Sequence, residues 1–259
     1  MDGPSADPRE IWDQRFSHLQ PLERPRPHRP TRSRHRTTQS QRIPDAFYEP
    51  WLERWMPLLR TMGTTPVLDL GCGSGRDACY LTSYGLPVLV ADFSRQALRL
   101  TEQTTQGACA HAIELDIRNG LPFRRKAFRI IIANLSLHYH RWPQTNLIVE
   151  NVRQRLKSEG YLLARFNSTN DVNYGAQSHQ EVEPRCYIVD GVLKRFFNRD
   201  DFQALFQDGW RVQSLQEQLV YCYQKPKTVW EIVAQRAQGE TDVASHSVTK
   251  NADQTRDAL

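Results

Sequence analysis

Short apolar runs alternate with amphipathic segments through the middle of the chain. The runs are rich in Val, Ile and Leu, and each has the length of one strand. They predict five strands, at residues 67–70, 87–91, 109–115, 128–134 and 161–166. The amphipathic segments predict helices at about 76–84, 94–106 and 143–157. Strands that are separated by helices pair in parallel, so the pattern predicts an α/β fold with a central parallel sheet.

This alternation ends with the fifth predicted strand. Residues 168–198 contain two strand-like runs around Asp190-Gly191, a dipeptide that is typical of the type I′ turn of a hairpin. Two further strands, at 210–215 and 228–234, have no helix between them and are therefore predicted to pair antiparallel. We expect an inserted lid and a C-terminal antiparallel hairpin at the edge of the sheet.

The segments outside this core differ in composition. Residues 45–62 carry apolar side chains at helical spacing. Residues 1–10 and 236–259 are polar, and both are predicted to be disordered. We therefore divide the chain into a flexible N-terminal segment at 1–44, one domain at 45–235 and a C-terminal tail.

The positive charge of the chain is concentrated in one segment. The net charge is +5, and residues 21–42 hold seven arginines against Glu23, which gives +6 there and −1 for the rest. Four prolines in the same segment predict a solvated linker or an arm that contacts an acidic partner, nucleic acid or an anionic substrate. The near-neutral body argues against nucleic acid as the partner of the folded domain.

The cysteines and the apolar runs narrow the class of protein further. Five scattered cysteines with no C-x-x-C pair indicate neither a zinc site nor a disulfide framework, so we expect a reducing, cytoplasmic setting. No apolar run is long enough to span a bilayer, and the N-terminus lacks the apolar region of a signal peptide. The oligomeric state stays open.

The most informative motif is Asp69-Leu-Gly71-Cys-Gly73-Ser-Gly75, which joins the first strand to a helix. Glycine tolerates positive φ and lets a ligand approach the backbone, and the helix N-terminus offers free N–H groups. A dinucleotide site has G-x-G-x-x-G, but here Arg76 stands at the position of the third glycine. The pattern D-x-G-x-G-x-G resembles the first motif of class I S-adenosyl-L-methionine-dependent methyltransferases.

The resemblance covers about residues 66–235. It implies a Rossmann-like, mostly parallel sheet of seven strands that is flanked by helices and ends in the antiparallel hairpin. It also implies S-adenosyl-L-methionine as the cofactor and methyl transfer as the activity. The run from Asn167 to Gly175 and the later Lys194-Arg195-Phe196-Phe197 resemble a subgroup of small, largely uncharacterised bacterial methyltransferases.

The expected cofactor residues stand at the carboxyl ends of the strands, where open α/β sheets bind ligands. Asp92 follows the glycine loop by about twenty residues, the spacing of a carboxylate that accepts from ribose hydroxyls; helix capping is its alternative role. The resemblance places the methionine end of the cofactor on the glycine loop and the adenine at Asp116 and Ile117, for which a surface turn is the alternative. The full set is Asp69, Gly71, Gly73, Gly75, Asp92, Phe93, Asp116, Ile117 and Asn134.

Asn134 to His140 follow the fourth strand, where methyl transfer is expected. This segment departs from the [DN]-P-P-[YF] motif of base-modifying amino methyltransferases, and Asn134 lacks the charge that a metal-dependent catechol type requires. His138 is a candidate base because an ordinary histidine has a pKa near neutrality, and a structural histidine is the alternative. Tyr174 is the second candidate proton handler, and His140 is expected to be solvated.

The candidate substrate residues come from three segments. Residues 11–16 resemble the W-D-x-x-[YF] run that folds over the cofactor in many small class I methyltransferases, and a plain packing helix is the alternative. The polar run after the fifth strand suits a small polar acceptor, or else it satisfies its own backbone. Cations of the hairpin are candidates for pairing a carboxylate or phosphate, with a solvated face as the alternative. The candidates are Trp12, Asn167, Asn173, Arg185 and Lys194.

The sequence thus predicts a methyltransferase that acts, without a metal, on a small-molecule acceptor at oxygen or nitrogen. A peptide, protein or RNA methyltransferase that is recruited by the arginine-rich arm stays open as an alternative. So does a cofactor-binding subunit without catalytic activity. An oxidoreductase is a third alternative, because nicotinamide cofactors also bind glycine loops of this kind.

Overall fold

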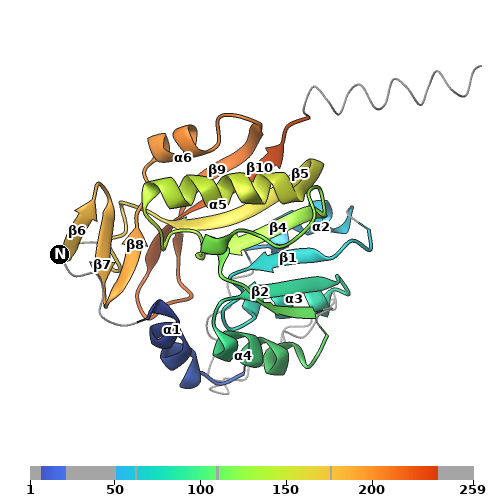
Figure 1. Ribbon diagram of the computed structural model, residues 1–259, viewed down its shortest axis with the longest axis horizontal. Coiled ribbons are helices and arrows are strands. Elements are labelled where there is room, and N and C mark those ends of the chain that lie inside the picture. Colours follow the sequence, from blue (N-terminus) through green and yellow to red (C-terminus); the bar gives the residue numbers. More distant parts are fainter. Residues whose placement is uncertain (1–6, 22–50, 62, 109–110, 176, 239–259) are drawn as a thin grey trace, which may run out of the picture.

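The computed structural model describes residues 7–21, 51–61, 63–108, 111–175 and 177–238. Its centre is a seven-stranded sheet in the order β3-β2-β1-β4-β5-β10-β9 (Figure 1). Strands β1 to β5 pair in parallel, whereas β10 pairs antiparallel with both β5 and β9. This confirms the α/β prediction with its C-terminal antiparallel hairpin. The strands are β1 (Val67–Leu70), β2 (Val88–Asp92), β3 (His111–Glu114), β4 (Phe128–Asn134), β5 (Leu156–Asn167), β9 (Trp210–Val220) and β10 (Lys227–Arg236).

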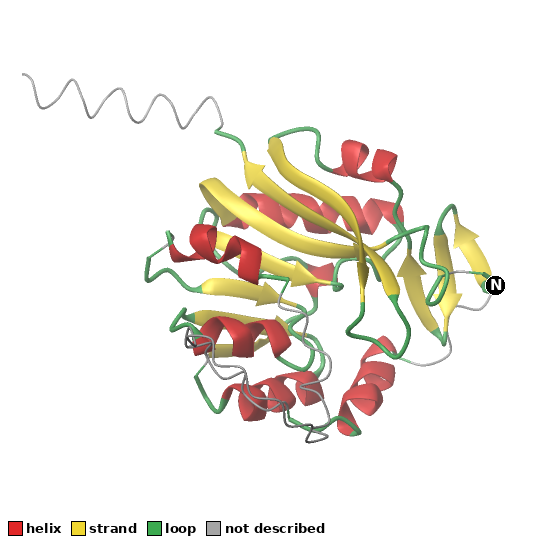
Figure 2. Ribbon diagram, turned by 180° about the vertical axis from the view of Figure 1, so that it is seen from behind, coloured by secondary structure: helices red, strands yellow, loops and turns green. Residues whose placement is uncertain are grey.

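Helices cover both faces of the sheet (Figures 1 and 2). Successive side chains of β1 point to opposite faces: Val67 packs with α2 and α3, whereas Leu68 and Leu70 belong to the cluster that includes α5 and α6. The inner parallel strands β1, β2 and β4 are therefore largely buried on both sides, whereas the edge strand β3 is mostly exposed. The helical elements are η1 (Glu53–Trp55), α2 (Met56–Arg60), α3 (Arg76–Ser83), α4 (Arg95–Thr105), η2 (Ile117–Asn119), α5 (Trp142–Arg155) and α6 (Arg199–Leu205).

The boundary between α5 and β5 differs from the prediction. The helix expected to reach Lys157 ends at Arg155, and the strand begins at Leu156 instead of Tyr161. The register between β4 and β5 shifts at this point, so the additional residues form an irregularity within the ladder. The sequence predicted a turn before the strand. The turn instead lies within β5, at Glu159, whose φ is 60°.

A three-stranded antiparallel sheet takes the place of the predicted inserted hairpin. It consists of β6 (Gln180–Glu183), β7 (Cys186–Val189) and β8 (Val192–Arg195). Asp190 and Gly191 have φ values of 50° and 73°, which confirms the type I′ turn between β7 and β8. The sequence did not predict β6, because Gln-Glu-Val-Glu has low strand propensity.

The N-terminal helix α1 (Pro8–Ser17) lies between the second sheet and α4 (Figure 1). The first ten residues are predicted to be disordered, and this prediction is wrong for residues 8–10, which belong to α1. Asp7 caps the helix by accepting a hydrogen bond from the backbone two residues later, at 2.9 Å. Asp13 accepts a hydrogen bond from the hydroxyl of Ser94, which ties α1 to the start of α4.

Some predictions fall outside the described residues. They concern the arginine-rich segment after Pro21, residues 45–50 of the segment with helical spacing, and the tail from residue 239. In the described part of residues 45–62 the chain forms η1 and α2, as the helical spacing predicted. Within the described residues, no helix is both long and apolar enough to cross a bilayer.

Candidate active site

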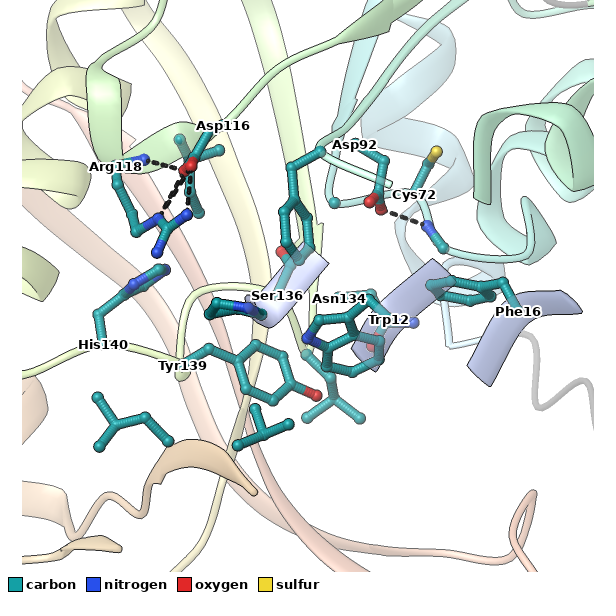
Figure 3. A pocket seen from close by; sticks show the side chains of 18 of the residues that line it. Trp12, Phe16, Cys72, Asp92, Asp116, Arg118, Asn134, Ser136, Tyr139 and His140 are labelled. Carbon is teal, nitrogen blue, oxygen red and sulfur yellow. Dashed lines mark hydrogen bonds and ion pairs between the residues drawn. The ribbon is translucent and has the colours of Figure 1, made fainter. Parts of the chain in front are cut away.

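A cavity of about 1000 Å³ lies at the carboxyl ends of β1, β2 and β4 (Figure 3). Ligands of open α/β sheets bind at this edge. One wall comes from the glycine loop, the end of β2 and the turn η2. The other wall comes from α1, the second sheet and the loop between β9 and β10. The expected cofactor residues and the helix that carries Trp12 therefore border one space.

The glycine loop leaves its backbone open toward this cavity. Gly71 and Gly73 line the cavity, with φ values of 74° and 54°. A Cβ on Gly71 would lie 2.3 Å from the Cβ of Ser136, so a larger residue requires a shift of the backbone. Gly75 does not line the cavity; a Cβ there would lie 2.9 Å from Thr101, so this glycine lets the loop pack against α4.

Asp92 ends β2, and its carboxylate points into the cavity beside the glycine loop (Figure 3). One oxygen accepts from the backbone N–H of Gly73 and the other from that of Ser94, each at 3.0 Å. Burial raises the pKa of Asp92, and these hydrogen bonds oppose the rise. The N-cap of α4 is Ser94, not Asp92. The bonds from Gly73 and Ser94 fall on different oxygens, so the carboxylate keeps lone-pair capacity for hydrogen bonds from a ligand.

Two buried oxygens find no hydrogen-bond partner in the described part of the chain, and both belong to residues that line the cavity. They are Oδ2 of Asp69 and Oδ1 of Asn134. Asp77 orders this region, because it accepts from the amide of Asn134 and from the indole of Trp51, both at 2.9 Å. Burial raises the pKa of Asp69 well above its usual value, and Asp77 and Asp92 add to the rise. Unpartnered oxygens in an acidic cluster fit the ammonium group of an amino-acid ligand.

Asp116 and Ile117 follow β3, and both line the cavity, as does Phe93 after β2. The carboxylate of Asp116 accepts four hydrogen bonds from Arg118, at 2.5–2.9 Å (Figure 3). Burial alone would raise the pKa of Asp116, but the bonds from Arg118 outweigh burial and lower it. Asp116 thus stays charged and is already held by a protein partner.

The two residues that we predicted to handle protons do not line the cavity. His138 is 2% exposed, its ring centroid lies 4.2 Å from that of Tyr139, and burial lowers its pKa well below the usual value. The hydroxyl of Tyr174 accepts from the backbone N–H of Lys225 at 2.9 Å. The geometry therefore favours a structural role for His138, and Tyr174 is held by the loop between β9 and β10.

Of the five predicted substrate residues, Trp12 lines the cavity and the other four do not. Arg185 is paired with an aspartate of α6 at 2.5 Å. Asn173 donates to a backbone carbonyl of the loop between β9 and β10 at 2.6 Å. Asn167 is buried at the end of β5, and Lys194 is half-buried on β8. The polar run after β5 therefore satisfies protein groups, which was the alternative reading.

The sequence did not predict that several further residues would line the cavity. Tyr139 and His140 lie in the loop after β4, and His140 is 8% exposed rather than solvated, because Arg195 of β8 packs beside it and donates to its carbonyl at 3.2 Å. Both residues follow Asn134 closely in the sequence, and this closeness could have indicated that they line the cavity. Cys222 and Tyr223 reach the cavity because β9 and β10 extend past the rest of the sheet, which no local pattern indicates.

His140 makes stability depend on pH. Burial and then the neighbouring Arg118 lower the pKa of His140 to about 4, against the opposing effect of Asp116. Because an unfolded histidine titrates near pH 6.5, the unfolded state binds the proton first as the pH falls, and stability is lost between about pH 6.5 and pH 4. We expect this contribution to fall by about 2 kcal/mol between pH 8 and pH 5. Urea unfolding at both pH values, with His140→Asn as the paired variant, measures it.

The buried carboxylates of Asp69 and Asp92 act in the opposite direction. Their pKa values are raised in the folded state, so the folded state takes up protons first and is favoured as the pH falls. Both groups are present in the parent and in His140→Asn, so the difference between the two proteins isolates the histidine. Equal pH slopes for the two would contradict the lowered pKa of His140.

Comparison with known proteins agrees with this site. Residues 67–160 match the family model described as a methyltransferase domain. The chain is similar to a S-adenosylmethionine-dependent methyltransferase from Methanosarcina mazei, with a TM-score of 0.59 and 18% identity over 71% of this chain and 98% of that one. It is also similar to the 1,6-didemethyltoxoflavin-N1-methyltransferase of Burkholderia thailandensis (TM-score 0.54, 16% identity, 72% and 78% covered). A third similar protein is the magnesium protoporphyrin IX methyltransferase of Synechocystis PCC 6803, with a TM-score of 0.51 and 15% identity over 72% of this chain and 78% of that one. A search of curated proteins found no match.

The sheet order, the glycine loop at the end of β1 and the matched family model define a methyltransferase domain of class I. Residues 67–160 match a methyltransferase domain, and the chain shares the fold of S-adenosylmethionine-dependent methyltransferases. S-adenosyl-L-methionine is the cofactor that this fold implies. The residues present fit this cofactor, since Gly71 and Gly73 open the loop, unpartnered oxygens stand beside it and Asp92 keeps free lone pairs.

Proposed function

We propose that the protein transfers a methyl group from S-adenosylmethionine to a small-molecule acceptor, at oxygen or nitrogen and without a metal ion. The observation that carries the proposal is that the cavity continues past the expected cofactor residues to α1 and the second sheet. Its volume of about 1000 Å³ is at the upper end of the range for ligand pockets, which leaves room for a second small molecule. The Burkholderia thailandensis neighbour, whose structure holds 1,6-didemethyltoxoflavin and S-adenosylhomocysteine, supports the proposal by analogy.

The residues of the cofactor side have separate tasks in this proposal. The oxygens of Asp69 and Asn134 receive the ammonium group of the methionine part. Asp92 accepts hydrogen bonds from the ribose hydroxyls. Phe93 and Ile117 pack against the adenine. Each of these side chains lines the cavity, and the two oxygens assigned to the ammonium have no hydrogen-bond partner among the described residues.

When bound, the cofactor supplies an electrophilic methyl group, whose bond to sulfur breaks as a lone pair of the acceptor forms the new bond to carbon. The protein holds the acceptor in line and keeps water out. Trp12 and Phe16 of α1 serve the second task, because both line the cavity beside the glycine loop (Figure 3). His140 also lines the cavity, but its pKa of about 4 makes it a weak base, so we assign catalysis to alignment of the acceptor and not to this histidine.

Independence from metal rests on Asn134 at the end of β4. A neutral amide there cannot replace the charge of a carboxylate ligand to a hard cation. The proposed setting is the cytoplasm, since the spacing of the five cysteines in the sequence is not that of a disulfide framework.

Methyl transfer from cofactor that carries an isotope label in the methyl group tests the proposal. The purified chain is incubated with phenols and nitrogen heterocycles, and labelled product and S-adenosylhomocysteine are expected in equal amounts. Chelation by EDTA and deletion of residues 21–42 should leave the yield unchanged. Cofactor binding without transfer to any acceptor would favour a non-catalytic subunit, and loss of transfer on deleting the arm would favour a macromolecular acceptor.

A further inference from the structure

The part of the cavity away from the glycine loop is bounded mainly by apolar side chains. Ile188 of β7 and Leu193 of β8 are paired in register, so they lie side by side on one face of the second sheet. Both line the cavity, together with Val182 and Val192. We call these four side chains the apolar wall. Such a wall favours a ligand that gains from leaving water.

Aromatic side chains border the same cavity. The ring centroids of Trp12 and Tyr139 lie 5.0 Å apart at an angle of 77° between the planes, so one ring presents its edge to the face of the other (Figure 3). Tyr223, from the loop between β9 and β10, also lines the cavity. Large rigid rings bind planar ligands through stacked and edge contacts. This border therefore favours a flat molecule.

The cations of the cavity are engaged by the protein. In the described part of the chain, three arginines line it. Arg118 is held by Asp116 at 2.5 Å, and Arg141 lies 3.6 Å from Glu183. Arg76 belongs to the first turn of α3, on the side of the glycine loop. An anionic acceptor would have to compete with these carboxylates for an arginine.

The acids of the cavity do not provide for a cationic acceptor either. Asp69 and Asp92 stand on the side of the glycine loop, and the proposed function assigns them to the cofactor. Glu181, near the apolar wall, is exposed and accepts from the backbone N–H of Arg185 at 2.8 Å. A charged ligand at the apolar wall would lose its hydration without gaining a buried partner.

We propose that the acceptor is an uncharged, flat and mainly apolar molecule that carries the methylated hydroxyl or ring nitrogen. It lies between the apolar wall and the rings of Trp12 and Tyr139. This inference rests on the proposed function and narrows its acceptor class. It replaces the small polar acceptor that the sequence suggested, because Asn167 and Asn173 do not line the cavity.

A charge series on one ring system tests this inference. Naphthol, naphthoate and naphthylmethylammonium share a flat body and differ in charge, while decahydronaphthol keeps the hydroxyl but is not flat. Calorimetric titration into the full chain, saturated with S-adenosylhomocysteine, measures each affinity. We expect naphthol to bind at least about tenfold more tightly than the others, because a charge gains no partner at the apolar wall and a saturated ring stacks poorly.

Variants of the wall link this binding to named residues. Ile188→Asp is expected to weaken naphthol binding by about tenfold or more, because it brings a charge into the apolar wall, and to leave S-adenosylhomocysteine binding unchanged. Leu193→Gln is a milder second variant for the case that the first does not fold. Leu219→Asp, at a position of β9 that is 50% exposed, is the matched control and should bind naphthol like the parent.

The outcomes separate this inference from the proposed function. Tighter binding of either charged compound, or unchanged naphthol affinity in the wall variants that fold, would overturn the inference. The inference would also be overturned if the chain binds S-adenosylhomocysteine but gives no heat with any of the four compounds. A chain that does not bind S-adenosylhomocysteine would instead count against the proposed function, and naphthol titrated without it would then test the apolar wall alone.

Discussion

Replacing Asp92 by Ala is expected to weaken the binding of S-adenosylhomocysteine by about 100-fold. A hydrogen bond to a charged group contributes about 1.5–3 kcal/mol, so two bonds to ribose hydroxyls at the lower figure give about 3 kcal/mol, or roughly two powers of ten. The geometry permits contacts to the ribose, because the hydrogen bonds from Gly73 and Ser94 fall on different carboxylate oxygens. Calorimetry at constant pH measures the affinity.

The same substitution removes an anchor of the glycine loop, and this effect has to be separated from the ribose contact. An analogue of S-adenosylhomocysteine without ribose hydroxyls should bind the parent weakly and Asp92→Ala no worse. Asp200→Ala removes an exposed carboxylate at the start of α6 and serves as the control, with no change in affinity expected. If the variant loses as much affinity for the analogue as for S-adenosylhomocysteine, Asp92 orders the loop and does not hold the ribose.

The features that the sequence predicted well depend on neighbours along the chain. Gly71 and Gly73 stand where a strand turns into a helix, and their positive φ values follow from that geometry. The start of α4 at about residue 94 and the Asp190-Gly191 turn are equally local. The conformation of each of these features depends on a few consecutive residues. For this reason the sequence could predict the glycine loop and the side of the cavity that it forms.

The opposite side of the cavity depends on contacts between distant segments. The strand β6 forms because β7 offers it a partner, despite its own low propensity. Arg185 looked like a substrate-binding cation, but the fold places Asp201 beside it. In the run after β5, the carboxylate of Asp171 accepts from the backbone of Asn173 and Tyr174, so these polar groups are used within the loop. The sequence shows which residues are polar but not which partners they will find.

Gly71→Ala is expected to lower the free energy of unfolding by about 3 kcal/mol and to abolish measurable cofactor binding. A φ of 74° costs an L-residue about 1–2 kcal/mol. The added Cβ would also lie 2.3 Å from the Cβ of Ser136, and such overpacking costs about 1–3 kcal/mol. Relief requires the glycine loop to move away from the loop after β4, which separates Gly71 from Asn134 across the cofactor site. Urea unfolding and calorimetry measure the two effects.

Gly85→Ala is the matched control, because Gly85 has a φ of 76° but a Cβ there would meet nothing within 4 Å. It should lose only about 1 kcal/mol, so the remaining difference of about 2 kcal/mol isolates the contact with Ser136. The double variant Gly71→Ala/Ser136→Gly lacks the opposing Cβ, so it should be more stable than Gly71→Ala. Ser136→Gly alone should not stabilise the protein. If Gly71→Ala and Gly85→Ala destabilise the protein equally, the loop after β4 yields without cost. The close approach at Gly71 would then not hold the two sides of the cofactor site together.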